Sequence, residues 1–131
     1  MNQQSEAAAS AAEASSQAPN CVVTEHWVDR IVIVSATGDI DMLSAPALEG
    51  GIRTAIGKDP GALVVDFSTV EFLASAGMGV LVAIHDEIAP SVEFCVVADG
   101  PATSRPLKLV GIADIIRVYP TLDEALSSLN A

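Results

Sequence analysis

The hydrophobic positions of this chain change their period several times after residue 20. Apolar residues alternate with polar ones, or form short continuous runs, over residues 21–27, 31–37, 62–67, 92–98 and 115–119. Both patterns are typical of strands. Helical spacing, in which apolar residues recur every three to four positions, covers residues 44–57, 75–89, 103–111 and 121–129. The expected order of elements is β-β-α-β-α-β-α-β-α.

This alternation predicts a single α/β domain with a mixed, mostly parallel sheet of four to five strands and about four helices. The apolar run at residues 62–65 is continuous, which indicates a strand covered on both faces. Only residues 28–30 separate the first two strands, so we expect these strands to form an antiparallel hairpin. Gly38 is expected to end the second strand.

The first 19 residues differ from the rest because they are almost entirely Ala, Ser, Gln and Glu. A segment of this composition cannot bury enough apolar surface to offset the entropy of ordering, so we expect a disordered tail. The folded domain is then expected to span residues 20–131.

The charge of the chain narrows its range of partners. Its 131 residues carry 17 acidic and 6 basic side chains, a net charge of −11. Nucleic acids and anionic membranes are bound largely through Lys and Arg, so neither is an expected partner. The acidity fits either a partner with a basic contact face or a simple role in keeping the protein dissolved.

No membrane-spanning apolar run is present, and the first basic side chain, Arg30, comes too late for a secretory signal. The expected compartment is the cytoplasm, and the expected oligomeric state is a monomer or a weak dimer.

The chain shows no pattern for a metal, a cofactor or catalysis. Cys21 and Cys95 form no CxxC pair, and Cys95 lies in an apolar run that predicts a buried thiol. His26 and His85 are far apart in sequence, and no glycine-rich phosphate-binding motif is present. A hydrolase that uses Ser75 would lack a base, so we expect a protein that is not an enzyme.

The most unusual segment surrounds Ser75, which we expect to cap the helix over residues 75–89. Its neighbours are small, so the backbone around its hydroxyl is open. The positive end of a helix dipole favours a phosphate at such a place. On spacing alone, an ordinary N-cap serine is the simpler explanation.

Three segments together resemble the STAS family, the domain of bacterial anti-sigma factor antagonists. Residues 75–79 (SAGMG) are similar to the family's signature loop, whose first serine is phosphorylated by a partner kinase. Residues 38–41 (GDID) are similar to its Gly-Glu-Leu-Asp turn. Residues 101–112 are similar to its third helix with the Gly-hydrophobic pair that follows. The resemblance spans about residues 22–129, and Ala74 departs from it because the family usually has aspartate there.

The resemblance implies a protein that binds an anti-sigma factor and thereby frees a sigma factor, with Ser75 as the site of phosphorylation. The implied partner surface comprises Asp39, Asp41, Ser44, Ala74, Ser75, Gly77, Met78 and Val82.

Helical spacing adds an expectation about the two apolar members of that surface. If the residues of one helix face, Gly77, Leu81, Ile84 and Ile88, lie against the sheet, then Met78, Val82 and His85 point away from it. They would form an exposed stripe beside Ser75, unless another part of the domain covers them.

A receiver-like domain with Asp66 as phosphoacceptor is the alternative. That fold also alternates strands and helices, and it would hold Mg²⁺ with acidic residues near Asp66. It starts with a βα unit, however, whereas this chain starts with an expected hairpin. It also requires a lysine at the end of the last strand, whereas Lys108 falls in a predicted helix. Asp66 as a residue that binds a neighbouring loop is the simpler interpretation.

Overall fold

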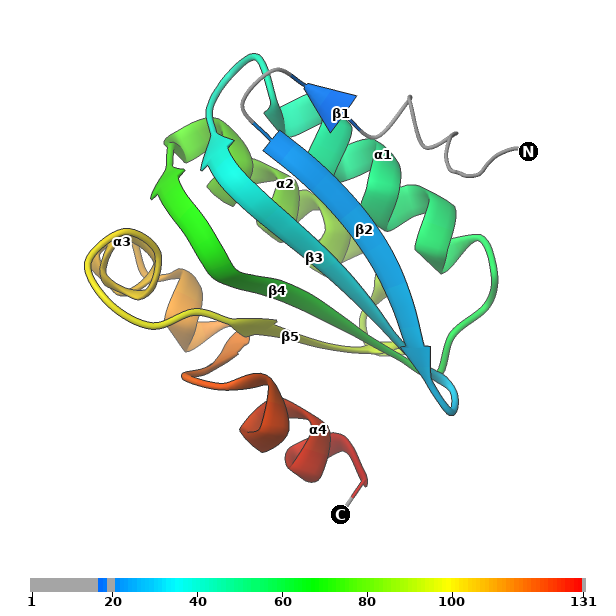
Figure 1. The fold of residues 1–131 in the computed structure, drawn as a ribbon. Coiled ribbons are helices and arrows are strands. Elements are labelled where there is room, and N and C mark those ends of the chain that lie inside the picture. Colours follow the sequence, from blue (N-terminus) through cyan, green and yellow to red (C-terminus); the bar gives the residue numbers. More distant parts are fainter. Residues whose placement is uncertain (1–16, 19–20, 131) are drawn as a thin grey trace.

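The computed structural model describes residues 17–18 and 21–130 and places all strands in one sheet (Figure 1). The strands are β1 Gln17–Ala18, β2 Cys21–Val28, β3 Ile31–Ile40, β4 Ala62–Leu73, β5 Glu93–Val97 and β6 Arg117–Tyr119. The helices are α1 Ala45–Ile56, α2 Ser75–Ile88, α3 Ser104–Leu109, the short 3₁₀ helix η2 Ile112–Asp114, and α4 Leu122–Asn130.

The strands lie side by side in chain order. β1, β2 and β3 pair antiparallel, and β3 to β6 pair parallel. The predicted hairpin joins β2 to β3 through a turn at Asp29 and Arg30, in which Asp29 takes a φ of 55°. The mixed, mostly parallel sheet and the expected α/β class are confirmed.

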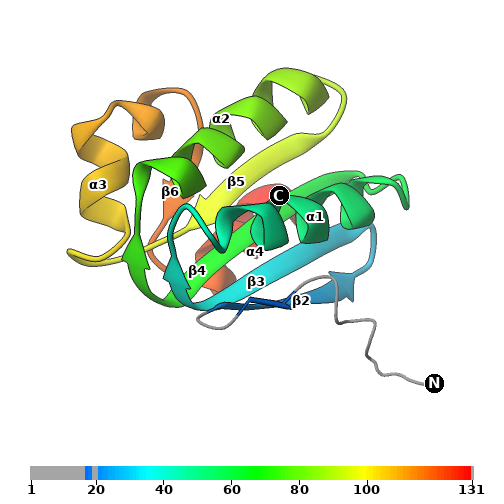
Figure 2. The same ribbon diagram turned by 90° about the horizontal axis from the view of Figure 1, so that it is seen from above.

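Helices cover both faces of the sheet (Figure 2). The larger core lies under α1, α2 and α3, where Leu48, Leu63 and Leu81 are fully buried. A smaller core lies under α4, where Ala125 packs on Ile33 and Val64. This two-sided burial explains the continuous apolar run of β4.

The end of β3 sets the positions of the two loops that meet at the carboxyl edge of the sheet. β3 was expected to stop at Gly38, but it continues to Ile40. The register with β4 shifts on either side of Gly38, and Gly38 takes a φ of 101°. Glycine allows this irregularity without strain, so it bends the strand instead of ending it. The extra residues bring Ile40 beside the start of α2.

The ends of the sheet also differ from expectation. Gln17 and Ala18, which were assigned to the disordered tail, pair with β2 as a two-residue strand, so the sheet has six strands among the described residues. The rest of that tail, residues 1–16 and 19, lies outside the described residues. The last strand starts only at Arg117, because residues 112–114 form a 3₁₀ turn.

Both cysteines are buried and free, as expected for Cys95. Burial raises the pKa of the Cys95 thiol to about 11. Burial also raises the pKa of the Cys21 thiol, and the nearby Asp41 and Asp39 carboxylates raise it further. Neither thiol is therefore activated as a nucleophile.

Candidate partner-binding site

The loops that carry five of the residues predicted to form a site meet at the carboxyl edge of the parallel strands (Figure 1). The loop after β3 carries Asp39, Asp41 and Ser44, and the junction after β4 carries Ala74 and Ser75. The backbone N–H of Ala74 donates to the Ile40 carbonyl over 2.8 Å, which joins the two segments directly. Loops after neighbouring parallel strands share one edge, so the sheet topology produces this meeting.

A network of hydrogen bonds fixes the loop between β3 and α1. Asp41 Oδ1 accepts from the backbone N–H groups of Leu43 and Ser44, each over 2.9 Å. The buried Ser44 hydroxyl donates to the Asp39 carbonyl over 2.8 Å and accepts from the Asp41 N–H over 2.9 Å. These bonds occupy polar groups that would otherwise cost free energy in a partly buried loop.

Ser44 stands at the N-cap position of α1, as predicted, but its hydroxyl makes no bond to the helix. The hydroxyl is engaged by Asp39 and Asp41 instead, so its role is to shape the loop. The backbone N–H of Ser44 and its hydroxyl hold the pKa of the Asp41 carboxyl below its ordinary value, with Leu43 adding a smaller effect in the same direction.

Ser75 was expected to cap α2, and this expectation is wrong. Ala74 occupies the N-cap position in an extended conformation, and Ser75 is the first helical residue. The N–H groups of Gly77 and Met78 donate to the Ala74 carbonyl. The Ser75 side chain is therefore exposed at the start of the helix and free of any capping bond within the described part of the chain.

Gly77 allows α2 to approach the end of β3 closely. A Cβ atom at this position would lie 2.5 Å from the Ile40 Cγ2 and 2.8 Å from the Leu73 Cδ1. Both neighbours are buried, so neither can move easily. Gly79, the other glycine of the loop, faces open space and would meet nothing within 4 Å.

The predicted exposure of Met78 is wrong, because only 8% of this residue is exposed. Val82 is half-buried and packs against the same core. α2 lies between α1 and α3 (Figure 2), and Met78 and Val82 belong to the core that these elements share with the sheet. Arg53 of α1 ties α1 to α2 through a two-bond ion pair with Glu87, at 2.7 and 2.9 Å. The alternative, that another part of the domain covers the stripe, is the correct one.

The exposed apolar side chains near Ser75 are others, which the sequence pattern did not reveal. Met42 and Leu43, in the loop after β3, are 77% and 82% exposed. Phe72, near the end of β4, is 52% exposed and pairs in register with Asp39. We call Met42, Leu43, Phe72 and Ser75 the loop surface. In the sequence, Met42 and Leu43 are apolar residues just before a predicted helix start. Apolar residues at that place also often pack against the helix as a buried hydrophobic staple, so the pattern does not show that they are exposed.

Asp66 does not resemble a phosphoacceptor. It lies within β4 instead of at its end, is buried, and accepts a hydrogen bond from the Ser68 N–H over 2.9 Å. Across residues 17–18 and 21–130, no cluster of His, Cys, Asp or Glu could hold a metal ion. No helix in this part of the chain is long and apolar enough to cross a membrane.

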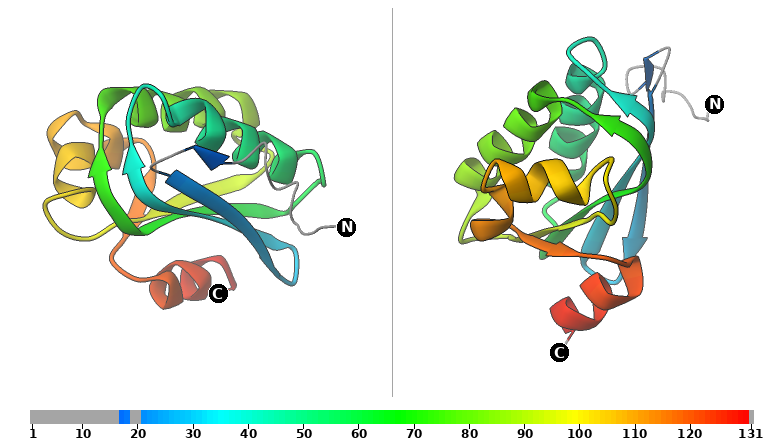
Figure 3. Two further views of the ribbon diagram at one scale, coloured as in Figure 1. Left: turned by 45° about the horizontal axis from the view of Figure 1, so that its top comes forward. Right: turned by 90° about the vertical axis from the view of Figure 1, so that its left-hand side faces the viewer.

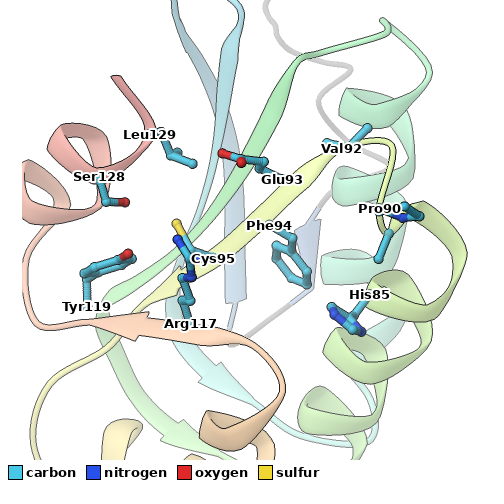
Figure 4. Close-up of a pocket in the computed structure, with 11 residues that line it drawn as sticks. His85, Pro90, Val92, Glu93, Phe94, Cys95, Arg117, Tyr119, Ser128 and Leu129 are labelled. Atoms are coloured by element: carbon cyan, nitrogen blue, oxygen red, sulfur yellow. The ribbon is translucent and has the colours of Figure 1, made fainter. Parts of the chain in front are cut away.

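A cavity of about 260 Å³ lies away from the loop surface, near the last turn of α2 (Figure 4). His85 and Pro90 border it on one side of β5, and Tyr119 and Ser128 border it on the other. None of the residues predicted for the site lines this cavity.

Comparison with known families identifies the class of protein that this fold and edge define. The STAS domain model matches residues 24–125. The chain therefore belongs to the STAS domain family, as the sequence resemblance indicated, and the receiver-like alternative is excluded.

Individual relatives narrow this class. The chain is 41% identical over 100 residues to the anti-sigma-F factor antagonist RsfB of Mycobacterium tuberculosis, covering 76% of this chain and 82% of the relative. A crystal structure of an anti-sigma factor antagonist from Mycobacterium paratuberculosis matches with 42% identity and a TM-score of 0.83, covering 87% of this chain and 98% of that one. Anti-sigma factor antagonists are regulatory proteins, so these relatives agree with a role that is not enzymatic.

A more distant structure shares the fold alone. The structure of the anti-sigma factor antagonist SpoIIAA in its unphosphorylated form matches with a TM-score of 0.68 and 18% identity, covering 83% of this chain and 96% of that one.

The two glycines of the loop should respond oppositely to alanine. Gly77→Ala forces a Cβ into Ile40 and should lower the free energy of unfolding by about 1–3 kcal/mol. Gly79→Ala adds a methyl group in open space and removes a flexible helical glycine, so it should raise that free energy by about 0.5–1 kcal/mol. Urea unfolding of both variants checks the contrast, and equal effects would contradict the close approach of α2 to β3.

The Asp41 carboxylate should stabilise the fold in a pH-dependent way. Its lowered pKa means that this contribution is complete above the ordinary aspartate pKa and is lost as the pH falls through the lowered value. Asp41→Asn should therefore lower the Tm at neutral pH, and the difference from the wild type should shrink in acid. Asp39→Asn is the control, and thermal melts across the pH range that show a constant difference for Asp41→Asn would refute this role.

Proposed function

We propose that this protein is an anti-sigma factor antagonist that works in the cytoplasm and contacts its anti-sigma factor through the loop surface. The observation that carries this proposal is the exposure of Ser75, Met42, Leu43 and Phe72 on two adjoining segments at one edge of the sheet, in a chain 41% identical to RsfB over 100 residues. Exposed apolar side chains gathered at one edge are typical of a protein interface. Binding would remove the anti-sigma factor from its sigma factor and so free the latter.

Phosphorylation of Ser75 by a partner kinase is the proposed switch. A phosphate adds nearly two negative charges, which would have to be desolvated inside the interface. Asp39 and Asp41 already lie on the neighbouring loop, so the added charge also meets like charges. Phosphorylated protein should therefore release its partner.

Ala74 affects how a kinase could recognise Ser75. The backbone at residue 74 has the extended geometry of an N-cap, but alanine supplies no oxygen to bond the free N–H groups of the helix. A kinase that reads a carboxylate next to the serine would find none here. We propose that the interface is retained while phosphorylation depends on other contacts, such as those with Asp39 and Asp41.

The Ser75 proposal is tested with the anti-sigma factor that copurifies with the protein and is identified by mass spectrometry. Ser75→Ala should abolish phosphate incorporation by the cognate kinase and keep partner binding. Ser75→Glu should weaken binding, because it places a charge in the interface. Phosphate mapped to Thr69 or Ser104 would overturn the assignment of the switch while leaving the interface proposal intact.

The interface itself is tested by a matched pair of variants. Leu43→Ser should weaken binding of the anti-sigma factor by about 1–2 kcal/mol, and it should change the free energy of unfolding by less than about 0.5 kcal/mol. Met78→Ser should show the reverse, with a loss of about 2–4 kcal/mol in stability because its side chain is buried.

Calorimetric titration and thermal melts of both proteins separate the two effects. Full-affinity binding by folded Leu43→Ser would exclude Leu43 from the interface.

A further inference from the structure

Half of the six basic side chains of this acidic protein bond to groups of the protein itself. Arg53 pairs with Glu49 and Glu87, and Lys58 pairs with Glu25. The Arg30 guanidinium donates to the Asp59 carbonyl over 3.1 Å. Within the described part of the chain, the remaining bases, Arg105, Lys108 and Arg117, take part in no ion pair.

Two of these free bases stand together on α3. Positions 105, 108 and 109 are three and four residues apart, so they share one face of the helix. Arg105, Lys108 and Leu109 line the same shallow groove, with a volume of about 630 Å³, and Asp99 is the one acidic residue in its wall. The opposite face of α3 is held in the core by the fully buried Leu107.

Large apolar side chains are also exposed at the end of α3 and just after it in the chain. Leu109 is 75% exposed, Val110 is 59% exposed and Ile115 is 53% exposed. Three exposed aliphatic residues within seven positions need a reason, because water-exposed apolar clusters tend to mark binding sites. α3 itself lies at the carboxyl end of β5, apart from the loop that carries Met42 and Leu43 (Figure 3).

We propose that this basic and apolar surface of α3 docks an acidic, partly apolar peptide segment of a protein partner. Carboxylates of the segment pair with Arg105 and Lys108, and its apolar side chains cover Leu109 and its neighbours. Charge complementarity supports this occupant, because the two free bases outnumber Asp99 in the groove. A polyanion such as a membrane surface or nucleic acid would be repelled by the net charge of −11, whereas a short acidic segment meets mainly the local field.

The proposal is tested by NMR titration of the full chain at low salt with a short synthetic peptide in which Glu and Leu alternate. Shift changes should be confined to residues 99–110 and 115. The double variant Arg105→Gln, Lys108→Gln should weaken binding about fivefold to tenfold. Leu109→Ser should also weaken it, and the same peptide with Gln in place of Glu should bind poorly.

The control is the double variant Arg30→Gln, Arg117→Gln. It also removes two positive charges, but outside the groove, and it should bind like the wild type. Equal weakening in both double variants would mean that only net charge matters, and it would overturn the docking site. Shift changes centred on residues 42–43 and 75, or preferential binding to phosphatidylserine vesicles, would overturn it as well. These results do not depend on whether the loop surface binds an anti-sigma factor.

Discussion

The close contact between Gly77 and Ile40 is the constraint on which the rest of the site depends. A Cβ at residue 77 would overlap the Ile40 side chain, so only glycine lets the first turn of α2 rest on the end of β3. The same approach brings the Ala74 N–H within 2.8 Å of the Ile40 carbonyl. Ser75, the next residue, is consequently held at the edge of the sheet with its side chain in solvent.

The loop after β3 is positioned from the same point. It leaves Ile40 and turns around the Asp41 carboxylate, which accepts from the N–H groups of Leu43 and Ser44. With its polar groups satisfied internally, the loop can hold Leu43 outward without help from the core. A surface held in this way loses little conformational entropy on binding, which favours its use as an interface.

The sequence was sufficient for the order of elements and for the segments that meet at the site. It did not reveal which side chains are exposed there. Met78 follows the outward spacing of α2, but the spacing of one helix cannot show that other parts of the domain pack against that side of it. The prediction that β3 ends at Gly38 was also wrong, because a glycine in a strand pattern is compatible with either a strand end or a bulge. Both errors concern tertiary packing, whereas the family motif, which is local, was assigned correctly.

Hydrogen bonds fix the contact between the end of β3 and the start of α2 and leave Ser75 free. Amide hydrogen exchange measured by NMR tests this claim most directly. The Ala74 amide, bonded to the Ile40 carbonyl, and the Ser44 amide, bonded to Asp41, should exchange slowly. The Ser75 amide, in the first turn of a helix, should exchange fast. Fast exchange at all three positions would show a loose loop and would contradict the account.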